Sequence, residues 1–394
     1  MLLETANHFV NKGSNVYVVF LDASKAFDRV CYTKLFRALL KRGLNKLYIR
    51  CLIYMYTNQK LCVSWNGFKT NSFSVSKRVK QGGVLSPLLF SVYVDGLFMR
   101  LRSSGYGCRM GPHFLGAFGY ADDICILCLT PNGLRKMITI CETYAVEYCI
   151  EFNGSKCEML ILSRRPLPLC MRPCVKVNNT VVPIKDSVIH LGNKISSDVT
   201  ERHVDYIVAK FYKQYNLFLS RFGKVSSLVK SQLFATYCCS FYGITLCDLS
   251  NTDSALVALR KCIRQVWRIS PRTHCDLLPH ISDICNHIFM KRFAKYFNNA
   301  MKSENDALKY VFAIAASTPG SPFSNNVKMI CDTANRGYLN GDMELGVSCK
   351  CFSVEELARK SHFIKELCMV RDGHLQVDLS HNEIQEMLDY MCLS

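Results

Sequence analysis

Residues 16–28 read Val-Tyr-Val-Val-Phe-Leu-Asp-Ala-Ser-Lys-Ala-Phe-Asp. The first six form an unbroken apolar, aromatic and β-branched run, which predicts a fully buried strand. That run ends at Asp22. A carboxylate at the end of a core strand costs free energy unless an opposite charge or a metal ion compensates it, so Asp22 is a candidate functional residue.

A second acidic segment, Tyr120-Ala121-Asp122-Asp123, lies between two apolar runs, residues 115–120 and 124–129. This pattern predicts a β-hairpin with the acids in its turn. An Asp-Asp pair on its own is most simply read as a turn former. Several acids at the ends of core strands are better explained by divalent cations, and carboxylate oxygens are ligands suited to Mg²⁺.

The surrounding pattern predicts an α+β part followed by helices only. Helices are expected over residues 33–56, with a turn near Gly43, over 86–101, with Ser86 as N-cap and Pro87 at the first position, and from 131 to 148. Further strands are expected at 159–162 and 188–195, with a hairpin at 175–182. After residue 196 the expected helices are 204–219, 226–242 and 255–267. These patterns divide the chain into residues 1–196, 197–270 and 271–394.

Charge indicates an anionic partner. The 394 residues carry a net charge of +18, and neither 29–94 nor 206–247 contains an Asp or Glu. A surface that binds phosphates excludes carboxylates, so both runs are candidates for nucleic-acid binding, in particular Lys77, Arg78, Lys80, Lys210, Lys213 and Lys224. No apolar run reaches membrane-spanning length and no signal peptide is recognised. We therefore expect no membrane partner and an intracellular location, in the nucleus and cytoplasm.

Five short motifs resemble, in order, those of reverse transcriptases of non-LTR (LINE-like) retrotransposons. They are residues 20–28, 81–90, 120–123, 152–156 and 190–192. The resemblance covers about residues 1–195 and is looser to about 270. It implies a right-hand polymerase, with a palm of antiparallel sheet and helices and partial fingers over 1–196. An all-helical thumb over 197–270 and a helical C-terminal region of unknown role over 271–394 would follow.

The resemblance also implies a reaction and the residues that perform it. An RNA-directed DNA polymerase adds deoxynucleotides to a primer 3′ end, so the implied partners are an RNA template, a DNA primer and dNTPs. Two Mg²⁺ ions, with Mn²⁺ as a substitute, would be held by Asp22, Asp122, Asp123 and the carbonyl of Ala23. The remaining implied roles are nucleotide binding by Phe27, Gln81, Gly82 and Lys156, with Phe27 excluding a 2′-hydroxyl, and a grip on the primer by His190, Leu191 and Gly192.

Two alternatives stay open. Only a short segment precedes Asp22, where the family places most of its fingers, so we expect an N-terminally truncated polymerase. A truncated chain could be a catalytically inactive, nucleic-acid-binding remnant of a retrotransposon. A protein similar to group II intron maturases is the third hypothesis, and the stretch 82–90 is less typical of that class.

Overall fold

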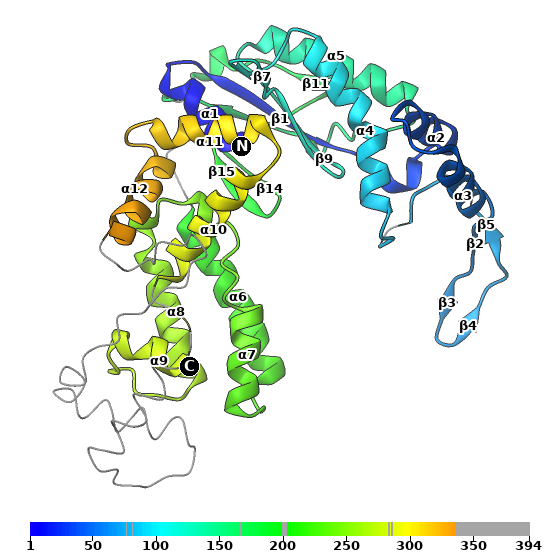
Figure 1. Ribbon diagram of the computed structural model, residues 1–394. Coiled ribbons are helices and arrows are strands. Elements are labelled where there is room, and N and C mark those ends of the chain that lie inside the picture. Colours follow the sequence, from blue (N-terminus) through cyan, green and yellow to red (C-terminus); the bar gives the residue numbers. More distant parts are fainter. Residues whose placement is uncertain are drawn as a thin grey trace. The chain divides into compact units, whose positions relative to one another are not determined.

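The computed structural model describes residues 1–335, apart from residues 76, 81, 166, 199–202, 283, 285 and 286. The chain forms two compact units, which divide between Glu201 and Arg202 (Figure 1). The first unit is a mixed α+β structure and the second is helical where it is described.

A five-stranded sheet forms the centre of the first unit. Its strand order is β13-β10-β1-β9-β8, and all neighbours are antiparallel except β10 and β13. The strands are β1 (Val16–Asp22), β8 (Ala117–Tyr120), β9 (Asp123–Cys128), β10 (Glu158–Leu162) and β13 (Ile184–Lys185). The predicted buried strand is therefore confirmed, and it lies in the middle of the sheet.

The two faces of the sheet are covered by different elements. Tyr17, Val19 and Leu21 belong to the larger core, together with side chains of α2 (Tyr32–Lys41), α4 (Ser86–Ser103) and α5 (Pro131–Glu147). Val16, Val18 and Phe20 point to the other face and pack with α1 (Leu2–Asn11) and the hairpin of β14 (Ser187–His190) and β15 (Asn193–Ser196). Because side chains alternate along a strand, Asp22 continues this second face.

Short hairpins surround the sheet. After α3 (Lys46–Thr57), a ribbon is built from β2 (Lys60–Leu61), β3 (Ser64–Trp65), β4 (Phe68–Lys69) and β5 (Phe73–Ser74). Two further hairpins are β6 (Arg109–Met110) with β7 (His113–Phe114), and β11 (Lys176–Val177) with β12 (Thr180–Val181). The hairpin at 175–182 is confirmed. The ribbon after α3 and helix α1 escaped sequence analysis.

Two local predictions were wrong. Residues 188–195 form a hairpin, not one strand, because Leu191 and Gly192 both have positive φ and turn the chain back. Ser86 is the first residue of α4 and Leu85 is its N-cap. The Ser86 hydroxyl donates instead to the carbonyl of Lys80, at 2.6 Å, and so ties the preceding loop to the helix.

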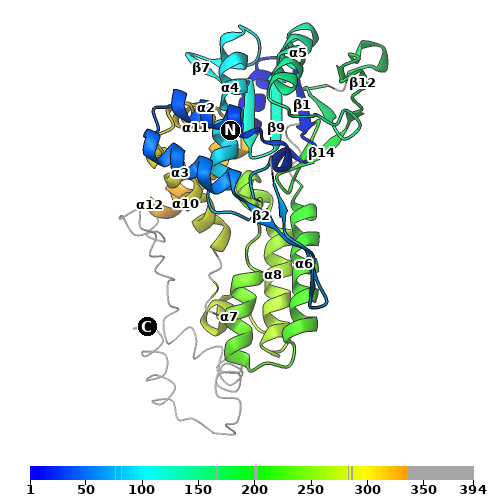
Figure 2. The same ribbon diagram turned by 90° about the vertical axis from the view of Figure 1, so that its right-hand side faces the viewer.

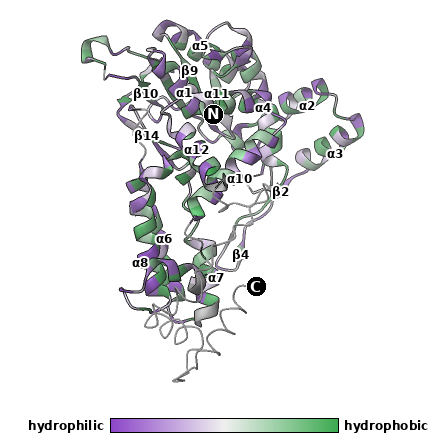
Figure 3. Cartoon of the chain, turned by 60° about the vertical axis from the view of Figure 1, so that its left-hand side comes forward, coloured by the Kyte–Doolittle hydropathy of each residue, from purple (hydrophilic) through white to green (hydrophobic). Residues whose placement is uncertain are grey.

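The second unit begins with three helices in mutual contact, α6 (Val204–Phe222), α7 (Ser227–Tyr237) and α8 (Asp253–Val266), which run side by side (Figure 2). Helix α6 mixes hydrophilic and hydrophobic residues along its length (Figure 3), and it buries Ile207, Phe211, Tyr215 and Phe218 at helical spacing. The predicted helices at 204–219 and 255–267 are confirmed, and the one predicted at 226–242 ends at Tyr237. The predicted helical C-terminal region lies outside the described residues from residue 336 onward.

Later helices pack on the same unit. They are α9 (Leu278–Ser282), α10 (Ile288–Lys302), α11 (Asp306–Ser317) and α12 (Pro322–Asn335). Buried Asn326 of α12 bonds the backbone of Cys247 and Leu249, and Arg292 of α10 donates to the carbonyls of Cys239 and Ser240. The division near residue 270 stays a prediction. Among the described helices, none is both long and apolar enough to cross a bilayer.

Candidate active site

Asp22 and Asp123 face each other at the ends of β1 and β9. The carbonyl of Asp22 accepts a hydrogen bond from the N–H of Asn153, at 2.8 Å, on the side away from β9. The N–H and the carbonyl of a strand residue point to the same side, so both groups of Asp22 point away from β9. Asp22 and Asp123 therefore form a non-hydrogen-bonded pair. In such pairs the Cα atoms are about 4.5 Å apart and the side chains share one face, so the fold brings these two carboxylates together.

Asp122 lies in the turn that precedes Asp123. Tyr120 pairs with Asp123, which leaves a two-residue turn of Ala121 and Asp122. The φ of Ala121 is 53°, whereas Asp122 is not among the residues with positive φ. This is the pattern of a type II′ turn, whose first position favours glycine. An alanine there costs roughly 1–2 kcal/mol, so the backbone next to the acids is strained.

The neighbouring carboxylates affect the pKa of Asp123. Partial burial raises the pKa of Asp123, and repulsion from Asp122 and then from Asp22 raises it further. His190 opposes this shift. Its ring lies 4.9 Å from that of Phe20, and burial lowers its own pKa. The structure therefore places the β14–β15 turn, predicted to grip the primer, next to the acids.

The donor set fits a hard divalent cation, although the side chains do not form a preassembled site. Within the described residues, no three His, Cys, Asp or Glu side chains come close enough to hold a metal ion. In the same part of the chain, none of the three carboxylates forms an ion pair with Lys or Arg. Adjacent acids without a cationic partner are the setting in which Mg²⁺ is bound.

The carbonyl of Ala23 is directed toward the same region. Ala23 and Phe152 form an isolated antiparallel bridge, flanked by the bonds Ser24 N–H to Glu151 and Asn153 N–H to Asp22. In this pattern the backbone groups of Ala23 itself point away from Phe152. They therefore point to the side of β9, where Asp123 lies.

Phe27 is half-buried in the 3₁₀ helix η1 (Ala26–Arg29). Its ring stacks on Phe90, with centroids 4.8 Å apart, and its carbonyl accepts a hydrogen bond from the N–H of Val79 at 2.8 Å. These contacts fix the ring in place. Contact with a sugar stays a prediction.

The glycine loop before α4 is tight. Gln81 lies outside the described residues. Gly82 has a φ of 77°, which favours glycine. A Cβ on Gly83 would lie 2.8 Å from the Ser86 hydroxyl and 3.0 Å from the carbonyl of Lys80. The loop therefore needs both glycines for its own conformation.

Lys156 is exposed in a loop that contacts Asp22. The Lys156 N–H donates to the carbonyl of Asn153, at 3.0 Å, and buried Cys157 bonds the backbone of Asp22. The loop is held from behind, because a Cβ on Gly154 would lie 2.5 Å from the carbonyl of Val177. Lys156 thus extends from a fixed loop beside the first acid.

The predicted basic residues divide into exposed and engaged side chains. Lys77 and Lys80 are exposed. Arg78 forms an ion pair with Asp28, with 3.7 Å between the Nε of Arg78 and the Oδ1 of Asp28. In the second unit Lys213 and Lys224 are exposed, and Lys210 lies over the rings of Tyr206 and Tyr242. Lys230, in the same acid-free run, is buried and donates to the carbonyl of Gly223, so this lysine is bonded within the second unit.

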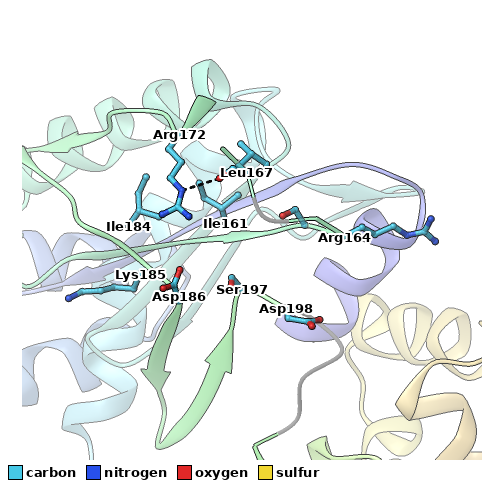
Figure 4. A pocket seen from close by; sticks show the side chains of 10 residues that line it. Ile161, Arg164, Leu167, Arg172, Ile184, Lys185, Asp186, Ser197 and Asp198 are labelled. Carbon is cyan, nitrogen blue, oxygen red and sulfur yellow. Dashed lines mark hydrogen bonds between the residues drawn. The ribbon is translucent and has the colours of Figure 1, made fainter. Parts of the chain in front are cut away.

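A cavity of about 300 Å³ lies at the other end of the sheet (Figure 4). Its lining includes Ile161, which pairs with Tyr17 near the start of β1, and Arg172, whose Nε donates to the carbonyl of Leu167. Asp22 ends the same strand five residues later. The cavity is therefore separate from the acids.

The model of the family "Reverse transcriptase (RNA-dependent DNA polymerase)" matches residues 2–211, which is more than half of the chain. The chain belongs to this reverse transcriptase family. The resemblance to LINE-like enzymes is confirmed by curated relatives. A Pol polyprotein from the type-1 retrotransposable element R2 of Nasonia vitripennis is 31% identical over 38% of this chain and 15% of its own length. The RNA-directed DNA polymerase from mobile element jockey of Drosophila funebris is 25% identical over 77% of this chain and 34% of its own length.

The chain thus spans between about one seventh and one third of these relatives. Among solved structures, telomerase from Candida albicans in complex with a fragment of telomeric RNA matches 84% of this chain and 53% of its own. That match has 12% identity and a TM-score of 0.41.

Proposed function

We propose that this chain is the polymerase core of a LINE-like retroelement and adds deoxynucleotides to a primer 3′ end on an RNA template. The observation that carries the proposal is the Asp22–Asp123 pair, with Asp122 in the adjoining turn. Family membership supports the reaction class. The proposed partners are the RNA template, a DNA primer and dNTPs, and the proposed location is intracellular, in the nucleus and cytoplasm.

Two Mg²⁺ ions, when bound, would supply activation of the primer hydroxyl and charge neutralisation at the leaving pyrophosphate. In this proposal Asp22, Asp122 and Asp123 hold the ions, together with the carbonyl of Ala23. Phe27, fixed by Phe90, excludes a 2′-hydroxyl, and Lys156 neutralises the triphosphate. The turn at His190, Leu191 and Gly192 positions the primer end.

A rival function is nucleic-acid binding without synthesis. It is favoured by one observation, namely that the described residues hold no three converged metal ligands. Primer extension on poly(rA)/oligo(dT) with Mg²⁺ separates the two functions. We expect measurable extension by the wild type and a loss of at least about 100-fold in Asp22→Asn and Asp123→Asn, since a metal contributes several kcal/mol to the transition state.

The matched control is Asp186→Asn, because Asp186 lines the cavity at the far end of the sheet. This variant should extend primers at the wild-type rate. No extension by the wild type, with duplex binding intact, would support the rival. Extension by all variants at equal rates would reject the assignment of the acids.

Binding of the duplex is tested by its salt dependence. When exposed Lys213 and Lys224 neutralise phosphates of the duplex, the counterions bound to those phosphates are released. Replacing both lysines with Gln should therefore lower the steepness of log K against log salt by about 1–2. Buried Lys230→Gln should reduce stability and leave the slope unchanged. An unchanged slope in the Lys213/Lys224 variant would place the contact elsewhere.

A further inference from the structure

The ribbon between α3 and the glycine loop carries an exposed aromatic face that the proposed function does not use. Trp65 and Phe68 flank its tip and are 77% and 83% exposed. Val63 and Phe73 are 55% and 50% exposed. The ribbon leaves the end of α3 as a narrow two-stranded projection (Figure 1), so this face has room for a ligand.

A β-bulge puts these side chains on one face. Near the tip Trp65 pairs with Phe68, whereas at the base Leu61 pairs with Phe73. Between these pairs the return strand has one extra residue, so that Cys62 faces both Asn71 and Ser72. Without the bulge Phe73 would lie opposite Lys60, on the other face. The register therefore gathers Leu61, Val63, Trp65, Phe68, Thr70 and Phe73 on a single surface, here called the aromatic face.

The opposite face is polar and basic. It carries Lys60, Ser64, Lys69 and Ser74 by the same alternation. Lys77 and Lys80 follow at the base and are exposed, and no acid occurs from residue 29 to 94. Such a surface would repel cations and attract a polyanion. The ribbon is only two strands wide, so long lysine side chains on one face lie near the edges of the other, aromatic face. Rings and cations without carboxylates are typical of surfaces that bind single-stranded nucleic acid, where bases stack on rings and phosphates meet cations.

We propose that the aromatic face is a binding site for single-stranded nucleic acid, with bases stacked on Trp65 and Phe68. The site rests on the proposed function for the nature of its partner, but it lies outside the acid cluster. A duplex hides its base faces, so the ribbon selects the unpaired strand. Its root is joined to the nucleotide side of the palm through Val79, whose N–H donates to the carbonyl of Phe27.

The experiment uses Trp65 as the reporter. The chain has two tryptophans, and Trp267→Phe leaves Trp65 as the sole indole. The full chain carrying this change is titrated with r(A)12 and with the duplex r(A)12/d(T)12, in EDTA and without dNTPs. We expect quenching of Trp65 by the single strand and none by the duplex. No quenching at a concentration where binding is saturated would overturn the proposal.

Two double variants separate stacking from charge, each measured over a range of salt. Trp65→Ala with Phe68→Ala should weaken single-strand binding by roughly 10- to 100-fold at every salt concentration, with the slope unchanged. Lys60→Gln with Lys69→Gln should flatten the slope. Trp65→Phe with Phe68→Tyr should restore binding. Equal affinities for the alanine variant and the wild type would overturn the proposal and favour a protein partner.

The two proposals fail separately. Quenching of Trp65 in a chain that extends no primer would support the ribbon site and contradict the polymerase function. Primer extension by a chain whose Trp65 fluorescence is not quenched would support the polymerase function and contradict the ribbon site.

Discussion

Two hairpins of the first unit share a turn geometry and differ in the residue that adopts it. The β6–β7 turn begins at Gly111, with a φ of 56°, and the β8–β9 turn begins at Ala121, with a φ of 53°. Glycine adopts this conformation at little cost, whereas alanine is strained in it. The second position of the unstrained turn is Pro112, and the second position of the strained turn is Asp122.

The same division extends to other turns. The tips at Asn66-Gly67 and Asn178-Asn179 use residues that tolerate positive φ, but Leu191, beside the acid cluster, has a φ of 48°. Ala121 and Leu191 thus adopt positive φ beside the acids, and Phe241 and Arg268 adopt it in the second unit. Strained residues are common at functional sites, so the strain at Ala121 and Leu191 agrees with the proposed place of the chemistry, although strain is not confined to that place.

The largest expected effect concerns the second turn position. Asp122→Asn should reduce primer extension by at least about 100-fold, since it removes a proposed metal ligand. Pro112→Ala, at the equivalent position of the β6–β7 turn, should leave extension unchanged. Comparable losses in both variants would mean that turn integrity, not the carboxylate, limits synthesis.

The first turn position should respond through stability. Gly111→Ala places a Cβ in the left-handed region and should lower the free energy of unfolding by about 1–2 kcal/mol. Urea denaturation measures this change. A neutral effect would show that the chain relaxes at this turn, and the contrast with Ala121 would then lose its meaning.

The reverse substitution at the strained turn should have a smaller effect of opposite sign. Ala121→Gly relieves the strain but adds entropy to the unfolded chain, so the gain in stability should be below about 1 kcal/mol. Primer extension should fall several-fold, because Asp122 is held less firmly. A variant that is more stable and also faster would show that the strain serves no catalytic purpose.

The smallest effect is a dependence of stability on pH. The pKa of Asp123 is raised by burial and by repulsion from Asp122, so the folded state binds this proton more tightly than the unfolded state does. Stability from this group is therefore lost as the pH rises from 3.8 through the raised folded-state pKa. Asp122→Asn should lower the pKa of Asp123 and weaken this loss, as measured by ¹³C NMR titration and denaturation at several pH values.

Much of the fold could be predicted from periodicity alone. The apolar run of β1 specifies a buried strand. The apolar residues at helical spacing from 204 to 222 specify an amphipathic helix. The ribbon was missed, although Asn66-Gly67 between Trp65 and Phe68 is a strong hairpin signal. Its strands are two residues long and exposed, and thus lack the apolar runs by which β1 was recognised.

The site was predicted in its residue types and less well in its geometry. Asp22 and Asp123 could be named from their places at strand ends, but their direct pairing depends on the register of β1 and β9. The burial of Lys230 and the pairing of Arg78 with Asp28 arise from tertiary packing. A run of basic residues in the sequence does not reveal which of them are engaged.

The central claim is that Asp22, Asp122 and Asp123 form the divalent-metal site of a polymerase, and binding of Mn²⁺ tests it most directly. Electron paramagnetic resonance would count Mn²⁺ bound to the full chain with a primer–template duplex whose primer lacks a 3′-hydroxyl, plus the next dNTP. We predict that the wild type and Asp186→Asn bind the ion equally, and that Asp22→Asn and Asp123→Asn lose most of the bound Mn²⁺. Equal binding by all four proteins would contradict the account.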